Sequence, residues 1–176
     1  MELPLTYYGN PILRKKCAQI GEIDEELRLF IKDLEETLIA CQGYGIAAPQ
    51  VGKALALFLV NIPIQKGEDE WEPGQTKVYI NPKIVHYSPE EWERPEACLS
   101  IPGVSGRVSR PVTINIEATN LEGKRFTETL TALEARAFMH ENDHINGVLY
   151  IDRVRGKERE AMEPLLRKIK KKYATP

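Results

Sequence analysis

The sequence has few cysteines and no long hydrophobic run. Three cysteines are scattered among 176 residues, and an odd, widely spaced set is a poor disulfide framework. The longest apolar stretch, from Ala54 to Val60, is far shorter than the roughly 20 residues of a membrane-spanning helix, so we expect a buried strand there. The start of the chain has no basic segment followed by an apolar one, as a secretory signal would. These absences favour a cytosolic protein with reduced thiols.

The composition is typical of one folded domain, with 42% hydrophobic and 28% charged residues. We find no repeat and no linker, and therefore expect residues 1–176 to form a single domain. The net charge of −2 is unevenly distributed, because the segment from Arg153 to Pro176 carries +6 and residues 1–152 sum to −8. A basic tail indicates either a polyanionic partner or an ordinary solvated helix face.

Hydrophobic periodicity in the first two thirds of the chain predicts a helix followed by strands. Apolar residues at three- and four-residue steps predict a helix that begins after Asp24, a good N-cap, and ends at Gly43. The segment from Gln65 to Lys77 is polar and acidic, and we expect an exposed loop there. Apolar and β-branched patterns predict strands over 55–62, 78–85, 112–119 and 125–130.

The last third of the chain predicts two further helices. The first begins after Thr131 as a cap residue and runs from Ala132 to Asn146, with Gly147 as its stop. A short strand is expected over 148–151. The basic tail predicts a helix at about 157–173, and its regular part would begin at Pro164 because proline has no amide donor.

The segment His140-Glu-Asn-Asp-His144 lies on the first of these helices. Four residues of an α-helix leave two imidazoles about 40° apart around the axis and about 6 Å apart along it, close enough to bind one metal ion. Glu141 is then near the ion and available as a base rather than as a ligand. Together with Leu133 and Ala137, both histidines would form the core face of the helix.

A catalytic ion held by two histidines needs a third protein ligand. The remaining histidine, His86, lies upstream, and the downstream acids lie in the basic tail, where a surface role is favoured. Cys98 is the better candidate because Glu96-Ala-Cys-Leu-Ser-Ile-Pro-Gly103 predicts a loop that a metal-binding helix can face. For Cys17 and Cys41 we expect buried apolar thiols.

A third segment, Gly43-Tyr-Gly-Ile-Ala-Ala-Pro-Gln50, follows the first predicted helix. It lacks the lysine of a phosphate-binding loop and connects helix to strand, the wrong order for dinucleotide binding. Its small residues allow another backbone to approach closely, and Gln50 offers an amide donor.

The three segments, in this order and at these separations, resemble the peptide deformylases. Segments 9–14 and 147–152 share the similarity, which covers about residues 5–155. The resemblance implies an α+β fold with antiparallel sheets around the central metal-binding helix, an N-terminal helix and a C-terminal helix. It also implies hydrolysis of the N-formyl group of the initiator N-formylmethionine in new polypeptides, with release of formate. The location would be the bacterial cytoplasm, or an organellar matrix for a processed eukaryotic chain.

The same resemblance implies the chemistry of the site. One divalent ion, natively Fe(II), with Zn(II), Ni(II) or Co(II) also able to occupy the site, would be bound by Cys98, His140 and His144. Glu141 would be the general base, and the Gln50 side-chain amide and the Leu99 backbone N–H would stabilise the oxyanion.

Substrate-binding residues are expected around these groups. Gly45 would pair with the substrate backbone, and an apolar pocket for methionine would include Ile46, Leu133 and Ala137. Glu96 and Arg110 resemble the family's ion pair that steadies the cysteine segment; as an ordinary surface pair they would contribute at most about 1 kcal/mol.

Four positions depart from the family pattern. Ile46 and Ile145 stand where leucine is usual, which approximately conserves volume, and the other two lie next to expected metal ligands. Ala97 replaces a glycine beside the cysteine, and its methyl group would narrow the adjacent channel. Met139 replaces a glutamine before the first histidine, which would remove an amide from the surroundings of the metal. Because no ligand changes, these departures concern the rate more than the type of reaction.

Other interpretations stay open at this point. The chain can also be an HExxH peptidase, a nascent-chain or ribosome-binding module without turnover, or a protein with a purely structural metal. We expect N-formylated nascent chains as partners, and neither DNA nor a membrane. Ribosome docking would use the basic C-terminal helix, through Arg167, Lys168, Lys170, Lys171 and Lys172.

Overall fold

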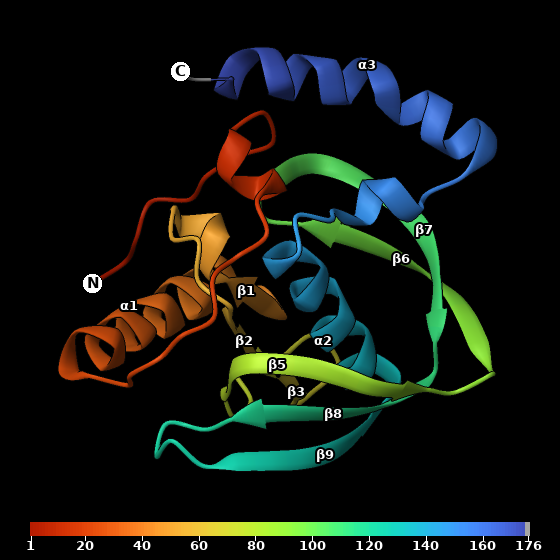
Figure 1. Cartoon of the computed structure of the whole chain (residues 1–176). Coiled ribbons are helices and arrows are strands. Elements are labelled where there is room, and N and C mark those ends of the chain that lie inside the picture. The colour runs from red at the N-terminus through yellow and green to blue at the C-terminus, as the bar shows by residue number, and fades with distance from the viewer. Residues whose placement is uncertain (175–176) are drawn as a thin grey trace.

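The computed structural model describes residues 1–174, in which helices near both ends of the chain flank a middle part made mostly of strands (Figure 1). The helices are the α-helices α1 (Glu25–Cys41), α2 (Ala132–Ile145) and α3 (Gly156–Tyr173) and the short 3-10 helices η1 (Pro11–Arg14), η2 (Ala48–Val51) and η3 (Tyr150–Arg153). The strands are β1 (Gly45–Ala47), β2 (Leu57–Val60), β3 (Ile64–Gln65), β4 (Trp71–Glu72), β5 (Lys77–Tyr87), β6 (Glu91–Cys98), β7 (Ile101–Pro111), β8 (Thr113–Thr119) and β9 (Arg125–Thr131). The predicted α+β class is confirmed.

The largest sheet has the order β1-β2-β5-β8-β9, and every neighbouring pair in it is antiparallel. Successive residues of β2 point to opposite faces, as the period of a strand requires. Leu57 and Leu59 pack with Leu38 of α1, whereas Phe58 packs against Phe138 of α2, with ring centroids 4.9 Å apart. The sheet therefore has α1 on one face and α2 on the other.

The hairpin β6–β7 lies on the other side of α2, and α3 crosses over it (Figure 1). A second apolar cluster fills this side, where Val108 of β7 packs with Leu149, Ile151, Met162 and Leu166. The helix α2 is thus enclosed between the main sheet and the β6–β7 layer. This enclosure explains why so much of α2 is buried, and it holds the His140–His144 segment at the centre of the molecule.

The first predicted helix is confirmed, with a different end. Asp24 caps α1 by accepting a hydrogen bond from the Leu27 backbone N–H at 2.8 Å. The left-handed residue after the helix is Gln42, with φ 54°, and Gly43 follows it. The prediction of a glycine cap was therefore wrong by one residue. The predicted exposed loop over 65–77 holds a small, exposed two-stranded ribbon, β3–β4.

The predicted loop around Cys98 was wrong, because residues 91–111 form the hairpin β6–β7, whose register shifts between Ala97 and Cys98. Cys98 pairs with Ile101, so that only Leu99 and Ser100 make the turn. Prolines at 95, 102 and 111 reduce strand propensity and concealed this hairpin in the sequence. The predicted strand over 148–151 was also wrong, since the 3-10 helix η3 begins at Tyr150.

The last helix begins at Gly156, so the prediction of a regular helix starting at Pro164 was wrong. Pro164 and Glu160 are both exposed, and water can therefore solvate the carbonyl that Pro164 leaves without a helical donor. The predicted range 157–173 is confirmed. Thr131 occupies the N-cap position of α2 but makes no capping bond, and its hydroxyl donates to the Val112 carbonyl at 3.3 Å.

The end of α3 is anchored to the start of the chain. The rings of Tyr7 and Tyr173 stack with centroids 4.3 Å apart. Gly9 lies so close to α3 that a Cβ there would be 2.8 Å from the Lys170 carbonyl oxygen.

Residues 175–176 of the predicted tail lie outside the described residues. Within the described part, no helix is long and apolar enough to cross a membrane.

Candidate metal centre

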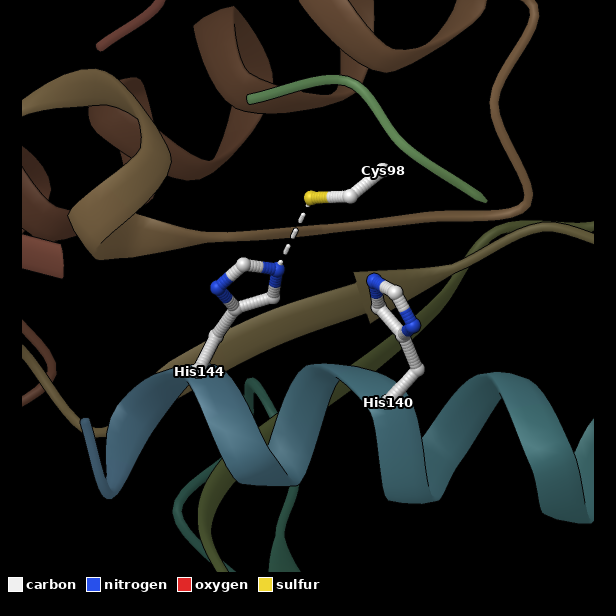
Figure 2. Close-up of side chains that lie close together, drawn as sticks. All are labelled: Cys98, His140 and His144. Carbon is white, nitrogen blue, oxygen red and sulfur yellow. Dashed lines mark hydrogen bonds between the residues drawn. The ribbon is translucent and has the colours of Figure 1, made fainter. Parts of the chain in front are cut away.

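Cys98, His140 and His144 converge on one point between β6 and α2 (Figure 2). One donor atom from each lies within 4.8 Å of the other two. Cys98 Sγ lies 3.2 Å from His144 Nε2. The two imidazoles come from successive turns of α2, with ring centroids 5.2 Å apart, and the thiol comes from the last residue of β6. Strand β6 therefore supplies the third donor, beside the two from the helix.

His140 is oriented by Glu96. Its Nδ1 lies 2.9 Å from Glu96 Oε1, so the other ring nitrogen is left for the converging group. Burial alone would raise the pKa of Glu96, but hydrogen bonds from His140 and Arg110 hold that pKa well below its usual range. A charged Glu96 favours the tautomer in which His140 carries its proton on Nδ1.

Glu96 also accepts hydrogen bonds from two arginines. Arg110 donates through Nε at 2.6 Å and Nη2 at 3.0 Å, and Arg136 donates through Nη1 at 2.6 Å. All three side chains are buried. The predicted pair of Glu96 and Arg110 is thus part of a buried cluster, and the surface alternative was wrong.

The cluster continues to a second carboxylate on α2. Asp143 accepts from Arg110 Nη1 at 3.0 Å and from Arg153 Nε and Nη2 at 2.7 and 2.9 Å. Arg136, Asp143 and Arg153 were not predicted as part of the site. Helical spacing gave a signal for the first two, because they lie four residues before His140 and three residues after it, on the same face of the helix.

The donors fit a divalent transition metal. A thiol and two imidazoles are ligands that iron, zinc, cobalt and nickel accept. Burial lowers the pKa of His144 well below its usual range, which keeps His144 in the neutral form that binds a cation. Glu141 Oε1 is buried and has no hydrogen-bond partner among the described residues. This unpaired oxygen indicates that a further polar group belongs beside the three donors.

Glu141 lies against β1. A Cβ at Gly45 would be 2.7 Å from both Cγ and Oε2 of Glu141, so only glycine allows this approach. Burial raises the pKa of Glu141 to about 7. Near neutral pH the carboxyl group can therefore both accept and return a proton.

The centre opens into a cavity of about 580 Å³, which we call the catalytic cavity. It is lined on one side by Gly43, Tyr44 and Gly45, and on the other by the β6–β7 turn and by α2. Gln50 is fixed at its inner end: Nε2 lies 3.2 Å from Ser100 Oγ and 3.6 Å from Cys98 Sγ, and Oε1 accepts from the Ala47 backbone N–H at 2.8 Å. Leu99 also lines the cavity.

Two of the three residues predicted for the methionine pocket line the catalytic cavity. Leu133 and Ala137 line the catalytic cavity, and Leu133 is 37% exposed, so its prediction as a core residue was wrong. Ile46 is fully buried in the apolar cluster beneath α1 and does not line the cavity, because its side chain points to the opposite face of β1. The prediction that Ile46 lines the pocket was therefore wrong.

The two departures next to the expected metal ligands have different surroundings. Ala97 is exposed and lines the catalytic cavity, where its methyl group occupies some of the channel. Met139 packs in the core between α2 and the main sheet. Because position 139 faces this core, an effect on the metal through it would be indirect.

Comparison with known proteins shows to which family the chain belongs. A family model described as polypeptide deformylase matches residues 2–160. The chain belongs to the polypeptide deformylase family. A deformylase relative, peptide deformylase 2 of Nostoc sp., is 44% identical over 156 residues, which cover 86% of each chain. Peptide deformylase 1B, chloroplastic/mitochondrial, of Arabidopsis thaliana is 36% identical over 171 residues, or 97% of this chain and 61% of the relative.

Solved deformylase structures share the fold. A crystal structure of peptide deformylase from Plasmodium falciparum matches 97% of this chain and 96% of its own, with 28% identity and a TM-score of 0.88. The chain spans about three fifths of the length of the plant relatives from Arabidopsis thaliana and Solanum lycopersicum, at 61% and 60%.

Proposed function

We propose that this chain hydrolyses the N-formyl group of the initiator N-formylmethionine of newly synthesised polypeptides and releases formate. The observation that carries the proposal is the convergence of Cys98, His140 and His144 beside the buried Glu141, at the inner end of a cavity, in a chain of the deformylase family. Residues 1–176 act as one catalytic domain in this proposal.

Cys98, His140 and His144 would hold one divalent ion, natively Fe(II), and the same donors suit Zn(II), Ni(II) or Co(II). When bound, such an ion supplies Lewis acidity, which polarises a carbonyl and lowers the pKa of water to about 7. Glu96 keeps the imidazole of His140 in the tautomer that can bind it.

The protein groups around this position divide the remaining work. Glu141 accepts the proton of the attacking water and later delivers it to the departing amine nitrogen, and a pKa of about 7 suits both transfers. Gln50 Nε2 and the Leu99 backbone N–H donate to the oxygen that becomes negative. One such donor typically contributes about 2.7 to 4 kcal/mol to the transition state.

The substrate backbone pairs with Gly45 on β1, which is an edge strand of the main sheet. Extended peptides bind to such edges by adding a strand. The methionine side chain lies on the apolar surface of Leu133 and Ala137 in the catalytic cavity.

Formate release from formyl-Met-Ala-Ser tests the proposal directly. We expect turnover of this peptide, and no turnover of acetyl-Met-Ala-Ser, whose larger acyl group has to fit beside the inner wall made by Gln50 and Cys98. A matched unformylated decapeptide checks for internal cleavage. Cleavage of that decapeptide, together with no formate release from formyl-Met-Ala-Ser, would instead identify a peptidase.

The exposed basic side chains of α3 would dock the enzyme on the ribosome, where formylated chains emerge. Formylated initiation places the protein in the bacterial cytoplasm or in an organellar matrix. Support comes from bacterial and organellar relatives among the matched deformylases.

A further inference from the structure

A second cavity adjoins the catalytic cavity and shares Gly43 and Tyr44 with it. We call it the distal cavity. Its volume is about 650 Å³, and its other walls come from the end of α1, the segment after β2 and the β3–β4 ribbon. Ile39, Asn61, Asp69, Trp71 and Glu72 are among its lining residues. The mechanism proposed above uses none of these five side chains.

The outer wall of the distal cavity is fixed in place by Asn61. The buried Asn61 side chain donates to the Gly74 carbonyl at 3.0 Å and to Thr76 Oγ1 at 2.9 Å, and it accepts from the Gly74 N–H at 2.8 Å. The Asn61 backbone N–H donates to the Tyr44 carbonyl at 2.8 Å. One residue therefore ties the base of the ribbon to the segment that the two cavities share.

The edge strand β1 points a bound peptide towards the distal cavity. Ala47 and Gln50 are fully buried, so a chain paired along β1 cannot continue past the inner end of the catalytic cavity. It must leave in the other direction, across Gly43 and Tyr44. An extended chain advances about 3.3 Å per residue, so the two-residue step from Gly45 to Gly43 spans about 7 Å. If the methionine of the substrate pairs at Gly45, the third residue lies at Gly43. The distal cavity is thus reached from about the fourth residue of the substrate.

The chemistry of the wall suits a cation on a long aliphatic stem. Trp71 is 60% exposed and Tyr44 is 48% exposed, so both rings are available at the surface. Residues 64–74 carry one lysine against four carboxylates, a net charge of −3. Lys66 pairs with Glu72 at 3.0 Å, and the other carboxylates outnumber it. Aromatic faces and carboxylates together attract lysine and arginine side chains.

We propose that the distal cavity is a second substrate-binding site, which binds lysine or arginine side chains at about the fourth to sixth residues of the polypeptide. This inference rests on the proposed deformylase function and adds a preference within it. Polypeptides with an early basic segment would be processed faster than those with an early acidic segment.

Two formylated hexapeptides test the preference, formyl-Met-Ala-Ser followed by three lysines or by three glutamates. We expect kcat/KM about fivefold to tenfold higher for the lysine peptide. Trp71→Ala and Asp69→Asn should reduce this ratio to below about twofold, through KM rather than kcat, while turnover of formyl-Met-Ala-Ser stays unchanged. Tyr87→Ala and Glu122→Gln are matched controls, because they remove an exposed ring and an exposed carboxylate elsewhere.

A ratio near one in the parent, or the same ratio in Trp71→Ala and Tyr87→Ala, would overturn the proposal. Quenching of tryptophan fluorescence by the unformylated lysine peptide gives a second readout that needs no turnover, and its loss in Trp71→Ala assigns it to Trp71 rather than to Trp92. Absence of formate from all formylated peptides would reject the proposed function. Fluorescence would then still decide whether the distal cavity binds the lysine peptide more tightly than the glutamate peptide.

Discussion

Arg136 donates to Glu96 at 2.6 Å from the same helix that carries both histidines. The guanidinium also donates to the backbone carbonyls of Val108 and Trp92, so it ties α2 to both strands of the β6–β7 hairpin. Glu96 in turn orients His140. Arg136 is therefore placed to set the distance between the histidines and Cys98 without contacting the reacting atoms.

The variant Arg136→Leu should lose metal about 10- to 100-fold more readily than the parent, because it removes a hydrogen-bond donor to Glu96, which orients His140. Arg136→Lys should restore part of the affinity by supplying one donor to Glu96. Metal retention during dialysis against a chelator measures both. Arg94→Leu is the matched control, since the exposed Arg94 packs on the same Trp92 ring. Equal loss of metal in the Arg94 and Arg136 variants would reject the positioning role.

Glu141→Gln should keep a full complement of metal and lower kcat for formate release by about 10²- to 10⁴-fold. The amide has nearly the same shape as the carboxylate and fits beside Gly45, but it cannot accept the proton of a water molecule. Metal analysis and turnover are measured on the same sample. Turnover at the parent rate would show that another group is the base.

Cys98→Ser should lower the metal content sharply. A thiolate is a good metal ligand, whereas a serine hydroxyl stays protonated at neutral pH. Cys41→Ser is the control, since Cys41 is the half-buried last residue of α1 and lies outside the metal-ligand group. Elemental analysis of the purified variants gives the stoichiometry. Full occupancy in Cys98→Ser would point to a different third ligand.

The helix of the centre could be predicted, whereas its surroundings could not. The 3.6-residue period and the stop at Gly147 locate α2, and the spacing of His140 and His144 is a local property of that helix. The β6–β7 hairpin depends on pairing between residues up to 20 positions apart, such as Glu91 with Pro111. Its prolines weaken the local strand signal, so the sequence predicted a loop where the pairing makes a hairpin.

Burial was harder to predict than position. The pair of Glu96 and Arg110 was expected from resemblance, but its enclosure by Arg136 and Asp143 arises from packing α2 against two strands. Ile46 was also expected to be more accessible than it is, because the face of β1 to which it points depends on the register with β2. Contacts between distant elements set both outcomes, and sequence periodicity carries no information about them.

The ion pair between Arg14 and Asp152 should stabilise the protein in a pH-dependent way. Arg14 Nη1 lies 2.6 Å from Asp152 Oδ2, which joins η1 to η3. Partial burial would raise the pKa of Asp152, but the hydrogen bonds from Arg14 and from the Leu149 N–H outweigh burial and lower it. A lowered pKa in the folded state gives stability above the unfolded pKa of about 3.9, and this stability is lost as the pH falls through the folded value.

Asp152→Asn should therefore lower the free energy of unfolding near neutral pH by no more than about 1 kcal/mol, since the pair is part-exposed. The difference from the parent should shrink as the pH falls to about 3. Urea denaturation at the two pH values measures it, and Arg14→Gln with the double variant completes a cycle. A difference that stays constant with pH would show that the charge of Asp152 has no part in it.

The basic side chains near the end of α3 should determine ribosome association and leave the chemistry unchanged. Met162 and Leu166 hold the other face of the helix against β7 and η3. Five of the basic side chains are exposed: Arg167, Lys168, Lys170, Lys171 and Lys172. Replacing all five with glutamine keeps the helix and its buried face, and so separates charge from folding.

Co-sedimentation with ribosomes at low salt should fall in this variant, while formate release from formyl-Met-Ala-Ser stays at the parent value. Each phosphate contact removed should lower the slope of log K against log salt concentration by about one. A control with Lys15, Lys16, Lys53 and Lys124 changed to glutamine removes exposed charge elsewhere on the surface. Equal losses in both variants would indicate that overall charge, rather than α3, drives the association, and no loss in either would remove ribosome docking from the proposed function.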